Sequence, residues 1–226
     1  MNTLSVITLD GPAGVGKTTL ARACAAHLSL PYLDTGAMFR VLALKLGALD
    51  TVPEEQANAL LADLGEAPFR LQGSGQSTTL LLHNTPIGEE IRTEAIAHLA
   101  SRIAKLPCVR QKLAAFQRRM GEAQALVAEG RDMGTVVFPD AKVKFFLDAS
   151  PKTRALRRMQ DPKNRDTTKD LDALIAIISA RDTQDRTRAI APLRPADDEK
   201  IIDTSTLSID EVLAIMLAHI RRLWSL

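Results

Sequence analysis

The amino-acid sequence predicts an α/β protein in which helices wrap a parallel β-sheet. At the N-terminus, an apolar run over residues 4–9 leads through a glycine-rich loop into a helical pattern. The second half of the chain repeats a rhythm of strand, loop and helix, which is typical of parallel sheets. Acidic residues also recur where predicted strands give way to loops, and the carboxyl ends of parallel strands share one rim. We therefore expect the functional site at that rim.

Length and composition fit a single globular domain. The chain has 226 residues, of which 46% are hydrophobic, so it can bury a full core. A net charge of +2 and an aromatic content of 4% give no reason to expect a nucleic-acid partner or a membrane surface. Cys24 and Cys108 lie far apart without histidines at ligand spacing, so we expect two buried thiols. With no signal-peptide pattern and no span-length apolar run, the expected location is the cytoplasm.

The stretch from Asp10 to Thr19 fits a phosphate-binding loop. Glycine backbones can turn successive N–H groups toward phosphate oxygens, and the helix that begins near Lys17 adds the positive end of its dipole. Lys17 is then placed to reach the β- and γ-phosphates of a nucleotide, and the Thr18 hydroxyl to ligate Mg²⁺. A glycine-rich turn before an ordinary helix is the weaker alternative, because all fixed positions of the motif occur together with its strand and helix flanks.

In the first half, helices alternate with short strands before the pattern changes. The expected helices cover residues 18–28, 38–46, 53–64, 93–104 and 108–120. The third of these begins with a capping box at Thr51, and Gly121 is expected to end the last one. A short strand over 31–33 belongs to the main sheet. Residues 69–71 and 78–82 predict a hairpin outside that sheet, followed by a second turn at 84–86.

The second half supplies the remaining strands and helices. Strands are expected over 125–128, 143–147 and 200–202, and helices from Pro151, over 171–188, and up to residue 223. Ser150 is expected to cap the first of these helices, and the segment 208–211 to form a capping box for the last. The almost entirely polar residues 160–170 predict an exposed, mobile loop.

Several aspartates stand at the predicted ends of strands. Aspartate is a common turn and cap residue, and this is the interpretation we favour for Asp148 and Asp203. For Asp34 and Asp132 a functional role is favoured, because each lies in a glycine-flanked loop beside another polar group.

Two clusters of charged residues flank the polar loop. Their spacings, i, i+3, i+4 in the first and i, i+4, i+7 in the second, put each cluster on one helix face. The clusters are Arg154, Arg157 and Arg158, and Arg181, Asp185 and Arg188. A solvated, ion-paired face is the ordinary interpretation of such a cluster. Beside a phosphate-binding loop, however, arginine forks suit the binding of transferred phosphoryl groups.

The sequence resembles bacterial cytidylate kinases over nearly its whole length. The resemblance rests on the segments GPAGVGKTTL, YLDTGAMFRVLAL, EGRDMGTVVFPDA and RDTQDRTRAIAPL, of which the last two are the most specific. It implies a P-loop NTPase-type fold with a five-stranded parallel sheet, in one nucleoside monophosphate kinase domain over 1–226. The core would cover 1–64, 92–153 and 171–226, with a monophosphate-binding insertion at about 65–91 and a lid at about 154–170.

The resemblance also implies an activity and a set of site residues. The activity is transfer of the ATP γ-phosphate to CMP or dCMP with Mg²⁺, in pyrimidine nucleotide metabolism, by an expected monomer. ATP would be bound by Gly11, Pro12, Ala13, Gly14, Val15, Gly16, Lys17, Thr18, Thr19, Arg154 and Arg158, with Thr18 as the metal ligand. Catalytic work would fall to Lys17, Arg131, Arg157 and Arg188.

The acceptor nucleotide would meet three groups of residues. Its phosphate would be held by Arg40, Arg131 and Arg188, its sugar by Arg181 and Asp185, and its base by Ser101, Arg110 and Asp132, with Thr35 also on the acceptor side. The sequence departs from the family pattern at Thr35, Phe39 and Gln184. These departures leave the preference between CMP and dCMP open.

Two other functions remain possible at this stage. A nucleotide-controlled switch of the GTPase type would share the loop and sheet, but the guanine-reading NKxD pattern and a DxxG after a strand are missing. A related kinase could instead act on UMP, AMP or a small metabolite such as shikimate.

Overall fold

A computed structural model describes residues 6–47, 53–160 and 170–224. Five parallel strands form the central sheet in the order β2-β6-β1-β7-β8. The strands are β1 Val6–Asp10, β2 Tyr32–Asp34, β6 Leu126–Glu129, β7 Val143–Asp148 and β8 Lys200–Asp203. The predicted five-stranded α/β fold is therefore confirmed.

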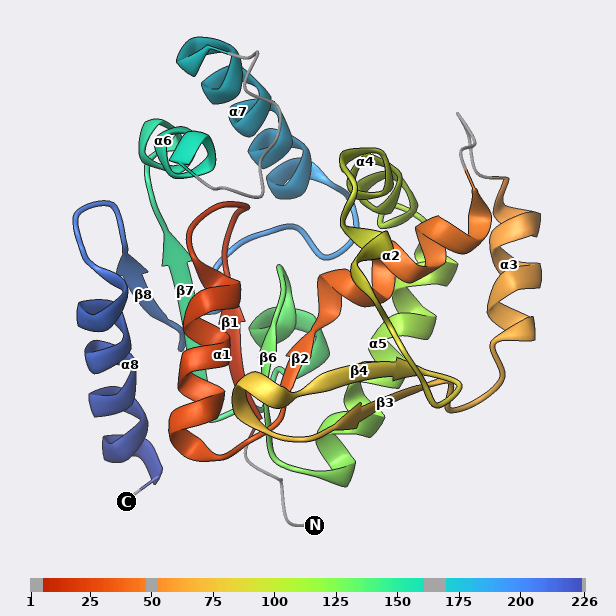
Figure 1. Ribbon diagram of the computed structural model, residues 1–226, viewed down its shortest axis with the longest axis horizontal. Coiled ribbons are helices and arrows are strands. Elements are labelled where there is room, and N and C mark those ends of the chain that lie inside the picture. The colour runs from red at the N-terminus through yellow and green to blue at the C-terminus, as the bar shows by residue number, and fades with distance from the viewer. Residues whose placement is uncertain (1–5, 48–52, 161–169, 225–226) are drawn as a thin grey trace.

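Helices cover both faces of the sheet, because successive side chains of a strand point to opposite sides. In β1, Val6 packs with helices α2 and α5, whereas Ile7 and Leu9 pack with α1 and α8. These helices are α1 Lys17–Leu28, α2 Thr35–Leu46, α5 Pro107–Ala123 and α8 Ile209–Trp224. Figure 1 shows α1 and α8 on one side of the strands and α2 with α5 on the other. The result is a three-layer arrangement.

Four further helices frame the carboxyl edge of the sheet and one flank. They are α3 Glu54–Asp63, α4 Glu94–Ile103, α6 Pro151–Gln160 and α7 Leu171–Thr187. Helices α6 and α7 pack together through a small apolar cluster of Ala155, Leu174 and Ile178. In Figure 1 this pair lies beyond the carboxyl ends of β1 and β7, with α4 beside it.

The predicted hairpin is confirmed outside the main sheet. It consists of β3 Phe69–Gln72 and β4 Thr79–Leu82, which pair antiparallel and are joined by the short turn η1 Gly75–Ser77. Residues 85–86, expected as a turn, instead form the short strand β5 Thr85–Pro86 against β4. The turn is made one step earlier, where His83 and Asn84 adopt positive φ angles of 48° and 64°. A second short helix, η2 Glu89–Arg92, leads on to α4.

Two helix boundaries differ from the sequence prediction by more than one residue. Helix α2 begins at Thr35 rather than at residue 38, because the Asp34 carboxylate accepts a hydrogen bond from the Ala37 N–H at 2.9 Å and caps the helix. Helix α5 continues past Gly121, which was expected to end it, as far as Ala123. Gly121 serves packing instead: a Cβ there would lie 2.6 Å from the Phe138 ring and 3.1 Å from Val6.

Other local predictions have mixed outcomes. Ser150 accepts from the Thr153 N–H at 3.1 Å, and Ser208 exchanges capping hydrogen bonds with Glu211, as predicted. Cys24 is buried, but Cys108 is only partly so. The expected cap at Thr51 and most of the polar stretch 160–170 lie outside the described residues. None of the helices in the described part of the chain is long and apolar enough to cross a membrane.

Candidate active site

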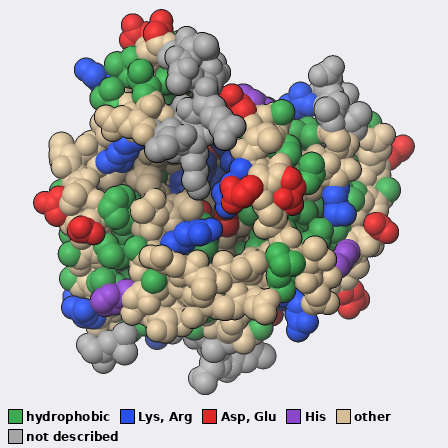
Figure 2. Space-filling view, viewed as in Figure 1, with side chains coloured by type: hydrophobic (Ala, Val, Ile, Leu, Met, Phe, Trp, Pro, Cys, Tyr) green, Lys and Arg blue, Asp and Glu red, His purple; other side chains and the backbone are tan. Residues whose placement is uncertain are grey.

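A cavity of about 280 Å³ opens at the carboxyl ends of the central strands. Helices α1, α2, α4, α5 and α7 and the loop after β6 all contribute to its wall. Figure 2 shows Lys and Arg side chains gathered in the hollow of this face. The wall includes all of the residues predicted to bind the acceptor: Thr35, Arg40, Ser101, Arg110, Arg131, Asp132, Arg181, Asp185 and Arg188. Of the predicted donor-binding residues, it includes Ala13, Gly14, Lys17 and Thr18.

The glycine-rich loop has the backbone that its sequence requires. Gly11, Gly14 and Gly16 have φ angles of 144°, 82° and 92°, which side-chain-bearing residues rarely adopt. A Cβ on Gly11 would lie 2.1 Å from the Leu147 carbonyl oxygen, so the loop runs directly against β7. Lys17 is folded over the loop, where its Nζ donates to the Pro12 carbonyl at 2.6 Å. Burial, followed by the charge of Arg131, holds the pKa of Lys17 well below its usual range.

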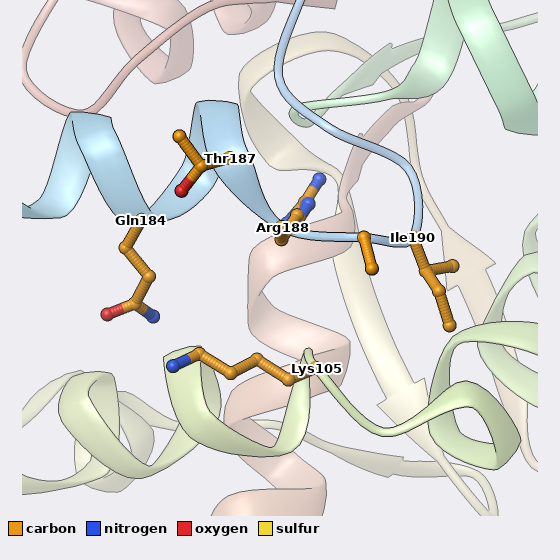
Figure 3. Close-up of a pocket in the computed structure, with 6 residues that line it drawn as sticks. Lys105, Gln184, Thr187, Arg188 and Ile190 are labelled. Atoms are coloured by element: carbon orange, nitrogen blue, oxygen red, sulfur yellow. The ribbon is translucent and has the colours of Figure 1, made fainter.

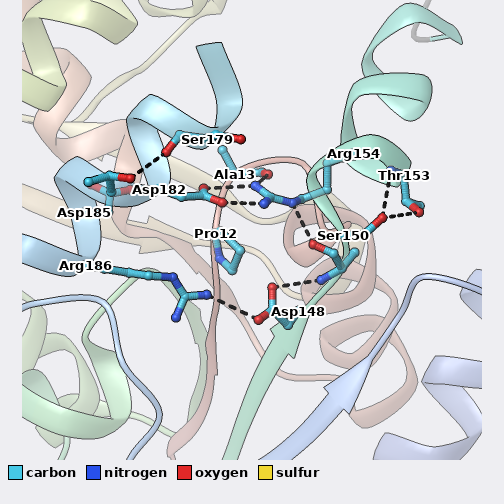
Figure 4. A network of polar contacts seen from close by, with 12 residues as sticks. Pro12, Ala13, Asp148, Ser150, Thr153, Arg154, Ser179, Asp182, Asp185 and Arg186 are labelled. Atoms are coloured by element: carbon cyan, nitrogen blue, oxygen red, sulfur yellow. Dashed lines mark hydrogen bonds and ion pairs between the residues drawn. The ribbon is translucent and has the colours of Figure 1, made fainter. Parts of the chain in front are cut away.

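The first charged cluster, on helix α6, does not line this cavity. Its members are Arg154, Arg157 and Arg158, and the first of them contacts the glycine-rich loop directly. Arg154 is buried and donates to the Ala13 carbonyl at 3.2 Å and the Ala149 carbonyl at 2.9 Å, while pairing with Asp182 (Figure 4). The Arg154 guanidinium thus hydrogen-bonds to two carbonyl groups and one carboxylate of the protein. Whether Arg154 also contacts ATP remains a prediction.

The other two arginines of this cluster also bind protein groups. Arg157 donates to the Thr204 hydroxyl at 3.0 Å, and that hydroxyl donates to the Val15 carbonyl at 3.3 Å. Arg157 therefore reaches the glycine-rich loop through one intermediary. Arg158 pairs with Glu94 on α4 at 2.9 Å. The catalytic role of Arg157 and the ATP contact of Arg158 stay predictions.

A buried ion pair stands at the α4–α5 end of the cavity. The Asp132 carboxylate accepts a close hydrogen bond from Arg110, and it lies 3.9 Å from Arg188. Both side chains of the Asp132–Arg110 pair are at least nine-tenths buried. The Arg110 guanidinium also lies 5.6 Å from the centre of the Phe39 ring. An acceptor and a donor are therefore held side by side, as a flat hydrogen-bonding ligand requires.

The second charged cluster is not a solvated surface. Asp185 is buried, accepts from Arg131 Nε at 3.1 Å and lies 3.8 Å from Arg188. Burial and the charge of Arg131 lower the pKa of Arg181 to about 10. The ordinary interpretation of this helix face as a solvated ion-paired surface is therefore wrong for Asp185.

Positive charges crowd the middle of the cavity. The charge of Arg131 contributes to lowered pKa values at Lys17, Arg40, Arg181 and Arg188, with burial the largest cause in each case. Among the described side chains, Arg181 Nε and Arg188 Nη2 are buried without a hydrogen-bond partner. Buried cationic donors of this kind suit a ligand that carries several negative charges.

A family model described as cytidylate kinase matches residues 7–222. The chain belongs to the cytidylate kinase family. A cytidylate kinase of Nitratidesulfovibrio vulgaris strain Hildenborough is 55% identical over 219 residues, which cover 96% of this chain and 93% of that relative. A cytidylate kinase of Oleidesulfovibrio alaskensis is 51% identical over 217 residues, with coverages of 96% and 98%. The resemblance drawn from the sequence motifs is confirmed.

Among solved structures, an uncharacterised protein from Eubacterium ventriosum is similar with a TM-score of 0.53 and 13% identity. The two chains cover each other over 97% and 99% of their lengths. This likeness supports the fold alone.

Glu129 lines the cavity but was not predicted as a site residue from the sequence. Glu129 ends β6, and its Oε1 accepts from the Thr18 hydroxyl at 2.7 Å and from the Tyr32 hydroxyl. Its Oε2 is buried with no partner among the described residues, and burial raises the pKa of this carboxyl. The predicted strand ended at Ala128, one residue too early. An acidic residue at a strand end, the same signal that marked Asp132, would have found it.

Thr18 and Glu129 together fit a Mg²⁺ ion that takes most of its ligands from phosphates and water. Mg²⁺ in phosphoryl-transfer sites is held by one or two protein oxygens in addition to the substrate. In the described part of the chain, no group of three or more His, Cys, Asp or Glu side chains could hold a metal by itself.

The remaining strand-end aspartates have structural tasks. Asp10 is buried and accepts from the Met133 and Gly134 N–H groups at 2.9 and 2.7 Å. It thereby holds the π-helical turn Met133–Val137, which follows directly on Arg131 and Asp132. Asp148 accepts from its neighbouring N–H, and Asp203 from the Ser205 N–H at 2.8 Å. The predicted turn role of these last two is confirmed.

Proposed function

We propose that this chain transfers the γ-phosphate of ATP to CMP or dCMP, giving ADP and CDP or dCDP. The observation that carries the proposal is that one cavity joins the glycine-rich loop, the arginine cluster and the Asp132–Arg110 pair. A phosphate donor and a base-bearing acceptor can thus meet within the same enclosure. Membership of the cytidylate kinase family supports the same reaction.

The donor half of the cavity holds phosphates by backbone and charge. The loop N–H groups and the start of α1 present positive dipole ends, and Lys17 adds a full charge next to the transferred group. Thr18, oriented by Glu129, would hold Mg²⁺, and the ion would supply positive charge against the negative charge that develops on the transferred group. Arg157, linked to the loop through Thr204, would support the same region.

The acceptor half orients CMP by its three parts. Arg40, Arg131 and Arg188 would bind its phosphate, and Arg181 with Asp185 would meet the sugar hydroxyls. Ser101, Arg110 and Asp132 would read the base edge, where the carboxylate accepts from the cytosine amine.

No general base is required in this scheme. The acceptor phosphate is already a nucleophile, so catalysis rests on positioning and on charge stabilisation of the moving phosphoryl group. A monomer as the active unit is also part of this proposal. The boundaries of the insertion and of the lid remain part of this proposal. None of the cavity residues comes from 65–91 itself, although Arg40 donates to the Ile91 carbonyl at 3.3 Å.

A panel of acceptors tests the proposal. Purified protein with ATP and Mg²⁺ is given CMP, dCMP, UMP, AMP or shikimate, and ADP release is measured. We expect fast release with CMP or dCMP and much slower release with the others. Preference for UMP, AMP or shikimate would replace the acceptor assignment, and nucleotide hydrolysis without any acceptor preference would favour a switch protein.

A further inference from the structure

Gln184 stands between the central cavity and a second, outer cavity of about 370 Å³. The outer cavity is lined by Lys105, Gln184, Thr187, Arg188, Ala189 and Ile190, and Figure 3 shows how they surround it. From helix α7, the Gln184 side chain reaches Ser101 on helix α4, and its Nε2 donates to Ser101 Oγ at 2.8 Å. Ser101 lines the central cavity, whereas Gln184 lines only the outer one. The hydrogen bond to Ser101 therefore links Gln184 with the central cavity.

The hydrogen bond fixes the direction in which the Ser101 hydroxyl can act. An amide nitrogen only donates, so Ser101 Oγ is the acceptor of this bond. A serine hydroxyl has a single proton, and no side chain or carbonyl in the described part of the chain is bonded to it as an acceptor. That proton remains available for a ligand in the cavity.

We propose that Gln184 is a positioning residue for base selection, which holds the Ser101 hydroxyl as a hydrogen-bond donor toward the acceptor nucleotide. The inference rests on the proposed function, in which Ser101 reads the base edge. Cytosine presents a ring nitrogen with a free lone pair at the position where uracil carries an N–H. A hydroxyl held as a donor at that position binds cytosine and fails to bind uracil, so Gln184 contributes to the preference for CMP through an atom that it does not touch.

The substitution Gln184→Glu tests the direction of the hydrogen bond to Ser101, because Glu and Gln side chains have nearly the same shape. A carboxylate only accepts, so it draws the Ser101 proton away from the cavity. We expect kcat/KM with CMP to fall roughly three- to tenfold, the size of one net hydrogen bond, mainly through KM. The loss with UMP should be smaller, so that the CMP-to-UMP ratio falls. Gln184→Met, which neither donates nor accepts strongly, should lie between Gln184→Glu and the unchanged protein.

Two controls separate this polarity effect from added charge and from misfolding. Thr187→Glu places a carboxylate in the same outer cavity three residues further along α7. The Thr187 hydroxyl that it replaces donates to the Thr183 carbonyl at 2.7 Å. It should leave the CMP-to-UMP ratio unchanged. In a Ser101→Ala background, Gln184→Glu should have no further effect on that ratio, because its intermediary is gone.

The outcomes distinguish the inference from the proposed function. If the unmodified protein does not prefer CMP over UMP, the base assignment itself fails. If it does prefer CMP, the inference is overturned by an unchanged ratio in Gln184→Glu, by an equal change in Thr187→Glu, or by an effect that persists without Ser101.

Discussion

Lys17 has an intramolecular partner that a bound phosphate must replace. Its Nζ donates to the Pro12 carbonyl at 2.6 Å, and its pKa is lowered mainly by burial. A bound γ-phosphate would favour the charged form and place that charge on the transferred group. We expect Lys17→Ala to reduce turnover by about 10²- to 10³-fold, as for loss of one electrostatic stabiliser. Steady-state kinetics measure this, with circular dichroism to show that the variant is folded; near-normal turnover would contradict the loop assignment.

Asp185 offers a test of sugar recognition. The carboxylate is buried between Arg131 and Arg188, so removing it also disturbs two phosphate-binding candidates. A hydrogen bond to a charged group contributes about 1.5 to 3 kcal/mol, and deoxyribose lacks one of the hydroxyls that Asp185 would bind. Asp185→Ala is therefore expected to lose more kcat/KM with CMP than with dCMP.

Arg188→Met is the matched comparison for Asp185→Ala. It removes a phosphate contact, and it should lose heavily with both CMP and dCMP. Parallel kinetics on the two nucleotides decide the matter. Equal losses in Asp185→Ala would remove Asp185 from the sugar site.

Most residues proposed to bind the acceptor lie in long, specific motifs, so the sequence alone could point to them. All of them line one cavity, including Ser101 and Asp185, which stand 84 positions apart in the sequence. The partners of those residues could not be predicted. Glu129 was not recognised because the predicted strand ended one residue too early. The ion pair between Arg154 and Asp182 depends on tertiary packing, which no local sequence pattern encodes.

Helix α5 depends on a glycine for packing rather than for ending the helix. A Cβ on Gly121 would lie 2.6 Å from the Phe138 ring, although Ala is a better helix former than Gly. We expect Gly121→Ala to destabilise the fold by about 1 to 3 kcal/mol, the usual cost of overpacking. Urea unfolding measures the change, and Glu122→Ala, at an exposed neighbouring position, should shift stability by less than about 0.5 kcal/mol. A stabilised Gly121→Ala variant would contradict the packing role.

The helices and strands were largely predictable, since apolar periodicity and caps are local signals. The structure differs from the prediction where a side chain makes a contact that was not predicted for it. Asp34 was read as a loop residue but caps α2, and the turn over 133–137 is held by Asp10, more than a hundred residues earlier in the chain. Such long-range hydrogen bonds leave no periodic trace in the sequence.

The stability of the whole molecule should depend on the protonation of Glu199. Burial, followed by the charge of Asp10, raises its pKa from 4.5 to about 7, and its Oε1 has no partner among the described residues. Between these pH values the folded state keeps a proton that the unfolded state has released. The free energy of unfolding therefore falls as pH rises from about 4.5 to about 7. Asp10, whose pKa is raised to about 6, contributes in the same direction.

Glu199→Gln should flatten this dependence. Urea unfolding at pH 5 and pH 8 compares the variant with the unmodified protein, and Glu122→Gln, at an exposed position, serves as the matched control. Between pH 5 and pH 8, we expect the free energy of unfolding to fall less in Glu199→Gln than in the unmodified protein or in Glu122→Gln. The same fall in all three proteins would show that Glu199 does not carry the effect.

The crowding of Lys17, Arg40, Arg181 and Arg188 around Arg131 affects how long the protein survives in a cell. Mutual repulsion weakens the free fold, and bound nucleotides relieve it. A ligand present at about 100 times its Kd adds about 2.7 kcal/mol to the stability of the folded state. We expect proteases to degrade the chain faster when nucleotide pools fall, so that the amount of enzyme follows the supply of its own substrates.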